Sequence, residues 1–403
     1  MRRYFPRHWS QWLGAGAAFL LLAIVGALAV AYSGIYNVSA NVPHFRPVFA
    51  FLQLTRDRSV AVHAKDVGEP PPISEAALVA RGATHYDRVC SFCHGAPGQP
   101  QSPTVQHMLP KPPLLGEFVA DRSPQELFWV VQNGLKFSGM PGWPAPERDD
   151  ELWALVSFIQ KLPGMSESEY RALAETPTAV SPDAAPSGGV ASDGGVNLVS
   201  TSAPSAQRPE RLATCVQCHG ADGRGRGVGA FPILGLQTER YLNQSLQAFA
   251  DGDRISGIMG SVAATLTEDD MAQLAAYYSR SGVPESPVIG DAPQALIDQG
   301  RQIVESGMPQ SNLVPCASCH SILKGNDDFE DQIYPQLAGQ YADYTATQLL
   351  AWRDSSRGEV RPGESMKNEA HRLSDDAIAA IAAYYASLTP EAPPPAAGNQ
   401  QGG

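Results

Sequence analysis

The chain has 403 residues, a formal net charge of −12 and six cysteines. At about 100–200 residues per domain, this length predicts two to four domains. Three arginines (Arg2, Arg3 and Arg7) are the only charged residues among the first twelve, so the remainder of the chain is still more acidic. A nucleic-acid-binding protein needs a basic patch, which this charge balance does not supply. The composition therefore excludes nucleic acid as a partner.

Residues 1–33 combine a basic N-terminus with an apolar run that has no charge from Leu13 to Tyr32. About 20 apolar residues span a bilayer, whereas the apolar part of a signal peptide has about 7–15. The length therefore predicts a retained transmembrane helix, although Ala29-Val30-Ala31 offers a site for cleavage. Because the arginines precede the run, we expect the rest of the chain on the outer side of the membrane.

Residues 34–66 connect this helix to the first domain. Phe45, Val48, Phe49 and Leu52 recur at the spacing of one face of a short helix. That face has two possible partners, the membrane surface or the first domain, and the pattern does not choose between them.

All six cysteines belong to one motif, C-x-x-C-H, which occurs at Cys90–His94, Cys215–His219 and Cys316–His320. This spacing is typical of c-type haem attachment, in which two thiols add to one porphyrin and the histidine is the proximal iron ligand. A zinc site would need further paired ligands, which are absent. The motifs predict three covalently bound haem c groups, held by Cys90, Cys93, His94, Cys215, Cys218, His219, Cys316, Cys319 and His320. Haem attachment also indicates an exported compartment such as the bacterial periplasm.

One small domain is expected around each motif, because a covalent haem can complete a small core. The predicted cytochrome domains are residues 67–165, 209–280 and 294–389. Residues 166–208 are rich in Ala, Pro, Ser, Gly and Thr, which predicts a disordered linker. Residues 281–293 are a short connector, and residues 390–403 are expected to be a disordered tail.

In the first domain, Ser74 is expected to cap a helix that leads to the first motif. Asp149–Leu162 is the predicted closing helix, with an apolar stripe along one side. Gly82 would allow an aromatic residue of that helix, Trp153 or Phe158, to approach its backbone.

The other two domains are expected to close in the same way. Thr267 precedes a closing helix over 268–280, and Ser374 precedes the closing helix of the third domain. The third domain begins with a predicted helix over Gln294–Ser306, whereas the first helix of the second domain is short or missing.

These two domains form an internal repeat, because Tyr241–Phe249 resembles Tyr344–Trp352. An arginine follows each segment, and we pair Arg254 with Arg361.

Each domain offers one methionine before its closing helix as the second iron ligand: Met140, Met259 and Met366. The alternative is that these methionines only fill the core. His371 competes with Met366, because histidine also ligates haem iron. A haem peroxidase would need an open iron position, and three candidate methionines argue against that activity.

The proximal histidines are expected to donate their second N–H to a carbonyl. A proline follows each motif (Pro112 or Pro113, Pro232, and Pro335), and its carbonyl is the predicted acceptor. The alternative is that these prolines only shape the loops.

Residues 209–389 resemble the dihaem cytochrome c4 family, through Phe231-Pro-Ile-Leu-Gly235, Pro335-Gln-Leu-Ala-Gly-Gln340, the two motifs and the late methionines. Residues 67–165 resemble a monohaem class I cytochrome c, through Cys90–His94 and Gly139-Met140-Pro141. The resemblance implies an all-α fold of three small cytochrome c domains, with His/Met-ligated haem and electron-transfer activity. The membrane anchor, the third haem and the long linker depart from soluble c4 proteins.

Together these features predict an electron carrier rather than an enzyme, anchored in the bacterial inner membrane with its domains on the periplasmic side. It would pass electrons between a quinol-oxidising complex or dehydrogenase and a terminal oxidase. The alternative is the cytochrome subunit of a membrane-bound alcohol or sugar dehydrogenase that delivers electrons to quinone. A linker of about 40 residues has a reach of roughly 35 Å, so we expect the c4-like pair to move relative to the first domain. In the other interpretation the linker only joins docked domains.

Overall fold

The computed structural model describes residues 9–39, 42–174, 209, 211–284, 288, 292–320, 334–358 and 364–389. Within these ranges the chain forms helices and loops, and extended segments pair only as isolated bridges. The predicted all-α fold is therefore confirmed.

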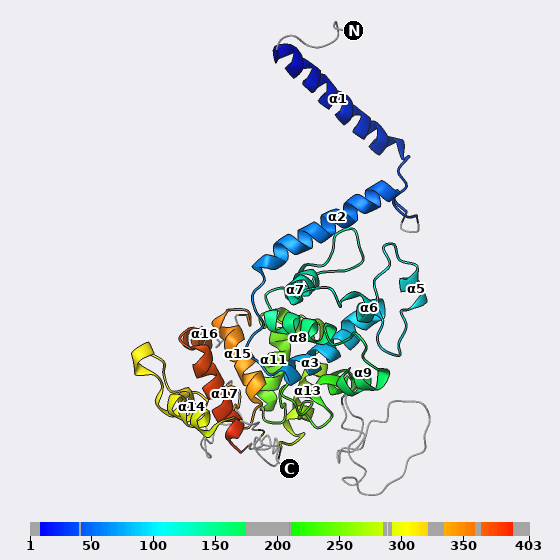
Figure 1. Ribbon diagram of the computed structural model, residues 1–403. Coiled ribbons are helices and arrows are strands. Elements are labelled where there is room, and N and C mark those ends of the chain that lie inside the picture. Colours follow the sequence, from blue (N-terminus) through cyan, green and yellow to red (C-terminus); the bar gives the residue numbers. More distant parts are fainter. Residues whose placement is uncertain are drawn as a thin grey trace, which may run out of the picture.

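Helix α1 (Trp9–Ser33) stands apart from the remainder of the molecule (Figure 1). Over Trp12–Ser33 it is the one helix of the described chain that is long and apolar enough to cross a membrane. Its apolar side chains are exposed on all sides, as a lipid-facing helix requires.

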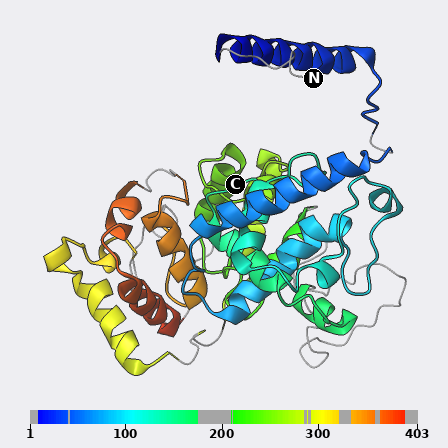
Figure 2. The same ribbon diagram turned by 45° about the horizontal axis from the view of Figure 1, so that its top comes forward.

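Helix α2 (Arg46–His63), followed by the short turn η1 (Ala64–Asp66), runs along the first domain (Figure 2). Its C-terminal half packs there, because Val60 is buried and the His63 ring stacks on Trp129 at 5.3 Å between centroids. At its N-terminal end Phe45 and Phe49 stay 67% and 44% exposed. The contact with the first domain thus lies beyond the predicted apolar face, of which only Leu52 is half-buried.

The first domain is built from eight helical segments. They are α3 (Glu75–His85), the π-helical turn η2 (Tyr86–Cys90), α4 (Ser91–His94), α5 (Pro103–Gln106), α6 (Leu115–Phe118), α7 (Pro124–Asn133), α8 (Asp149–Ile159) and α9 (Glu167–Ala174). The Ser74 hydroxyl accepts a hydrogen bond from the Ala77 N–H at 3.3 Å, which confirms the predicted cap. Helices α3 and α8 cross at Gly82, where an added Cβ would lie 1.9 Å from the Ala154 carbonyl oxygen and 2.9 Å from Phe158 Cβ. Of the two predicted aromatic residues, Phe158 makes this approach.

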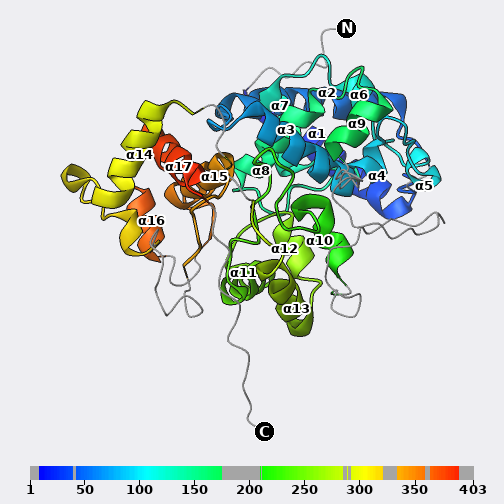
Figure 3. The ribbon, with the colours of Figure 1, turned by 90° about the horizontal axis from the view of Figure 1, so that it is seen from below.

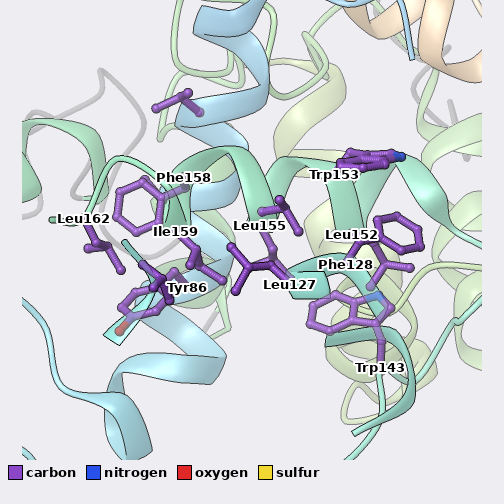
Figure 4. Close-up of a cluster of buried hydrophobic side chains, with 14 of the residues drawn as sticks. Tyr86, Leu127, Phe128, Trp143, Leu152, Trp153, Leu155, Phe158, Ile159 and Leu162 are labelled. Carbon is purple, nitrogen blue, oxygen red and sulfur yellow. The ribbon is translucent and has the colours of Figure 1, made fainter. Parts of the chain in front are cut away.

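The core of this domain lies between these crossed helices and α7 (Figure 4). Tyr86, Leu152, Leu155 and Phe158 are almost completely buried there. Burial of each large apolar side chain stabilises the fold by about 1.5–3 kcal/mol. The same core therefore fixes the turn that leads into the first motif.

Helix α9 departs from the sequence prediction, because its residues were assigned to the disordered linker. Tyr170 is fully buried in the first-domain core, and its hydroxyl donates to Asp87 Oδ1 at 2.7 Å. One buried tyrosine outweighs the polar composition around it, so the ordered first domain extends to Ala174 rather than residue 165. Residues 175–208 of the predicted linker, like residues 390–403 of the predicted tail, lie outside the described chain.

The remaining helices belong to the second and third domains. They are α10 (Leu212–His219), α11 (Glu239–Asp251), α12 (Met259–Ala263), α13 (Glu268–Ser279), α14 (Gln294–Ser306), the turns η5 (Pro309–Ser311) and η6 (Cys316–Ser318), α15 (Ala342–Arg353), α16 (Glu364–Ala370) and α17 (Asp375–Ser387). The Thr267 and Ser374 caps are both present, and α14 has the predicted bounds. In the second domain the helix that carries the motif begins only at Leu212.

The structure corrects one pairing within the repeat. Arg254 lies over the Phe249 ring at 4.3 Å, and Arg357 lies over the Trp352 ring at 4.6 Å. Each arginine follows its aromatic residue by five positions, so Arg357 is the counterpart of Arg254. Arg361, which the sequence comparison paired with Arg254, is outside the described residues.

The three domains are in direct contact, with α3 and α8 beside the helices of the other two (Figure 3). Arg81 Nε donates to the Ala230 carbonyl at 3.1 Å in a buried position, and Arg88 donates to the Thr214 carbonyl at 3.0 Å. The Ser74 hydroxyl also donates to Asp343 Oδ2 at 2.5 Å. These contacts fit the interpretation in which the linker joins docked domains, and they contradict a freely moving c4-like pair.

Candidate haem-binding sites

The proximal histidines are oriented by proline carbonyls in two of the three motifs. Nδ1 of His94 lies 2.9 Å from the Pro113 oxygen, and Nδ1 of His320 lies 3.0 Å from the Pro335 oxygen. Since a carbonyl only accepts, Nδ1 carries the proton and Nε2 is left for a metal. The predicted acceptors are confirmed at these two sites. At the remaining site, Nδ1 of His219 makes no full hydrogen bond within the described residues, although the Pro232 carbonyl lies near enough to offset part of the lowering of the His219 pKa by burial.

The protonation state of the histidines suits metal binding. Burial lowers the pKa of His94, His219 and His320, and that of His219 falls to about 4. The imidazoles are therefore neutral at physiological pH, and the neutral form is the one that ligates a metal. Nε2 of His320 is buried without a hydrogen-bond partner in the described chain, as expected of a nitrogen that faces an iron.

The cysteines do not have the properties of a redox dithiol. Burial raises the pKa of Cys90 to about 12 and those of Cys215, Cys218 and Cys316 to about 11. A reactive dithiol or a zinc site needs stabilised thiolates, which have a lowered pKa. Within the described ranges no three His, Cys, Asp or Glu side chains gather to hold a metal ion. Both alternatives to haem attachment are therefore disfavoured.

The second and third motifs share one cavity of about 1170 Å³. A pocket for one drug-sized ligand measures roughly 300–1,000 Å³, so this cavity has room for more than one large group. Its lining includes the motif residues Cys215, Cys218, His219, Cys316, Cys319 and His320. The structure thus brings the second and third motifs to the same cavity.

Two of the candidate distal ligands line the same cavity. Met259 is the first residue of α12, and Met366 lies in α16. His371 is exposed and is not part of the lining, which favours Met366 over this rival. Met140 is partly buried in the first domain, where its N–H donates to the Ser138 hydroxyl at 3.2 Å.

Two of the buried arginines that line this cavity, Arg254 and Arg357, face neutral partners. Arg254 donates to Tyr344 and Gln348, and Arg357 donates to Gln348, but no carboxylate of the described chain pairs with either. Burial and the neighbouring Arg254 lower the pKa of Arg357 to about 10. A buried cation needs an anionic partner. Haem carries two propionates, so the residues present fit this group. When bound, haem supplies an iron that takes up and gives up one electron.

Sequence reasoning assigned His85 no functional role, yet the structure places it where the first and second domains meet. Its ring lies 6.3 Å from Trp143 of the first domain and 6.3 Å from Phe231 of the second. Phe231 in turn lies 6.1 Å from the His219 ring. Aromatic rings therefore follow one another from the loop after Met140 to a proximal histidine.

A group of charges at this junction was also missed, in which Arg81, Arg148 and Glu151 are buried and Asp150 is largely buried. Asp150 accepts from both arginines, at 3.2 Å from Arg81 and 2.7 Å from Arg148, and their charges lower its pKa. Acidic residues in the first turn of a helix ordinarily indicate a favourable interaction with the helix dipole in solvent. The sequence gives no sign that this end of α8 is buried against another domain.

Protein-family comparison divides the chain in the same way. Residues 77–159 match the model of cytochrome c oxidase, cbb3-type, subunit III, and residues 210–279 and 298–389 match the cytochrome c model. A thiosulfate dehydrogenase electron acceptor from Stutzerimonas stutzeri is 32% identical over 43% of this chain and 78% of the relative. Cytochrome c4 from Pseudomonas aeruginosa is 32% identical over 44% of this chain and 85% of the relative. The crystal structure of reduced cytochrome c4 from Pseudomonas stutzeri, 31% identical, covers 45% of this chain and 97% of its own, with a TM-score of 0.40.

Proposed function

The chain belongs to the cytochrome c4 family of electron-transfer proteins, and on this premise we propose that it is a membrane-anchored triheme cytochrome of a periplasmic respiratory chain. It would take electrons from a quinol-oxidising complex or a dehydrogenase and pass them to a terminal oxidase. Cytochrome c domains of this kind carry covalently bound haem c. The proposal includes the number of haem groups, which is three, and their methionine ligands, which are Met140, Met259 and Met366.

The observation that carries the proposal is the repetition of one local arrangement beside a membrane-length helix. Three C-x-x-C-H motifs contain all the cysteines, and two of their histidines are oriented by a proline carbonyl. Helix α1 has the length and composition of an anchor. A carrier that is tied to the membrane meets membrane-bound partners without diffusing through the periplasm, and its local concentration near them stays high.

A second candidate function is that of a dedicated electron acceptor for one dehydrogenase. The similarity to two proteins named thiosulfate dehydrogenase electron acceptor, each 32% identical, favours this role. The dehydrogenase would then be a sulfur-compound enzyme rather than the alcohol or sugar dehydrogenase considered from the sequence. Purification from membranes without a crosslinker, followed by identification of the accompanying subunits, separates these roles.

The haem count and the anchor are tested on the same preparation. The denatured protein should keep its haem, and its mass should exceed that of the polypeptide by three haem groups. A mass increase of two haems would remove one site from the proposal. N-terminal sequencing should find the chain uncleaved and in the membrane fraction, whereas a start near Tyr32 in the soluble fraction would refute the anchor.

A further inference from the structure

The segment that leads to Met259 packs against the first domain. Ile258 is 8% exposed and belongs to the same hydrophobic core as Trp143 and Leu152 of the first domain. Ile255 and Val262 also lie against this core. Residues 254–262 therefore take much of their packing from a domain other than their own.

One buried carboxylate holds the turn before Met259. Glu151 of α8 is 4% exposed, and its Oε2 accepts from the Gly257 N–H at 2.8 Å while its Oε1 accepts from the Ser256 hydroxyl at 2.5 Å. The Ser256 hydroxyl also accepts from the Met259 N–H at 3.0 Å. A direct chain of hydrogen bonds thus runs from Glu151 to the backbone of the candidate ligand.

The surroundings leave this carboxylate little freedom. Trp143 Nε1 donates to Glu151 Oε2 at 2.9 Å, and Arg148 donates to the Ile255 carbonyl. A Cβ on Gly257 would lie 2.3 Å from Trp143 Nε1 and 2.9 Å from Glu151 Oε2, so the close approach of these two side chains to the backbone favours glycine here. A fully satisfied buried network of this kind defines one arrangement of the chain.

The third domain holds its own ligand segment by different means. Glu369 of α16, three residues after Met366, accepts from the Val314 N–H of the same domain at 3.2 Å. The second domain is thus distinguished by receiving this support from outside.

From these contacts we infer that Glu151 is a positioning residue for Met259, so that the first domain completes the distal side of the second haem site. The inference rests on the proposed function, in which Met259 is an iron ligand. It implies that the ligation and potential of the second haem depend on the docked first domain.

The test compares full-length Glu151→Ala, Glu151→Gln and Ser256→Ala with Glu126→Gln, which removes one carboxylate from an exposed helix cap of the first domain. Loss of one buried hydrogen bond of about 1.4 kcal/mol corresponds to about tenfold faster exchange. We expect hydrogen–deuterium exchange of residues 254–262 to rise at least about tenfold in Glu151→Ala and Ser256→Ala, and less in Glu151→Gln, which keeps an acceptor oxygen. In the same variants the reduction potential of one of the three haems should fall, and the absorption band of methionine-ligated ferric haem should weaken. Glu126→Gln should leave the exchange, the reduction potentials and the absorption band unchanged.

Unchanged exchange and unchanged potentials in Glu151→Ala would overturn the inference. Faster exchange with three unchanged potentials would also overturn it, because the segment would then be held without positioning a ligand. Failure of the proposed function is seen separately, as a mass that lacks the haem of the second site in the unsubstituted protein.

Discussion

Replacement of Gly82 by alanine tests the contact on which the first domain is built. An added Cβ would lie 1.9 Å from the Ala154 carbonyl oxygen, whereas ordinary contact begins at 3.4 Å. The obstacle is the backbone of α8, which no rotamer change can move. The two helices would therefore have to separate by about 1.5 Å, the difference between these distances.

The expected destabilisation follows from two opposing effects. Overpacking of a well-packed core costs about 1–3 kcal/mol, and an unmovable backbone atom places this site at the upper end. Alanine is better than glycine within a helix by about 1 kcal/mol, which offsets part of the cost. The net loss is about 2 kcal/mol, or a fall of about 10 °C in the Tm of a domain of roughly 100 residues.

Thermal unfolding of the full-length protein, followed by the fluorescence of the buried Trp143 and Trp153, is the measurement. Gly116→Ala is the matched control, because its Cβ would meet the Leu162 oxygen at an ordinary 3.6 Å. Equal midpoints for Gly82→Ala and Gly116→Ala would refute the reasoning. Gly300→Ala should repeat the effect in the third domain, where the Ala380 oxygen is 2.0 Å away.

Two further predictions concern the sites themselves. Met259→His and Met366→His should each lower the reduction potential of one haem, because a thioether ligand raises the potential relative to imidazole. His371→Gln should leave the redox titration unaltered. A shifted potential in His371→Gln would indicate that His371, and not Met366, is the ligand. Burial, together with the charge of Arg81, lowers the pKa of His85 from 6.5 to about 3, so between these values the unfolded chain binds a proton that the folded domain does not. The free energy of unfolding should therefore fall as the pH is lowered through this window, by roughly 2 kcal/mol between pH 6.5 and 5. His85→Gln should remove most of this pH dependence when the free energy of unfolding is measured by chemical denaturation at a series of pH values. An unchanged pH profile would show that His85 is not responsible.

Local features of the fold could be predicted from the sequence because short-range chemistry determines them. The caps at Ser74, Thr267 and Ser374 are present, and Gln294–Ser306 is a helix, since a capping hydroxyl and an apolar period act within a few residues. Pro113 and Pro335 were found for the same reason, because each lies shortly after its motif.

Contacts between the domains could not be predicted in this way. Glu151 and Gly257 are 106 residues apart, and nothing in either local sequence indicates the other. Helix α9 was missed because its polar composition resembles that of the linker, while Tyr170 and Ala174 bury one side of it in the core. Pairing of the arginines failed because the third domain offers both Arg357 and Arg361 after Trp352, and the stacking of Arg357 on Trp352 identifies the equivalent one.

The cavity shared by the second and third domains bears on how the protein is assembled. Cys215, Cys218, Cys316 and Cys319 all line it, and a porphyrin must reach each pair of thiols before thioether bonds can form. The domains close around the cavity through paired hydrogen bonds between Gln340 and Ile233, at 2.9 and 3.1 Å. We therefore expect haem attachment to precede the docking of the two domains, so that the closed pair is the last stage of maturation.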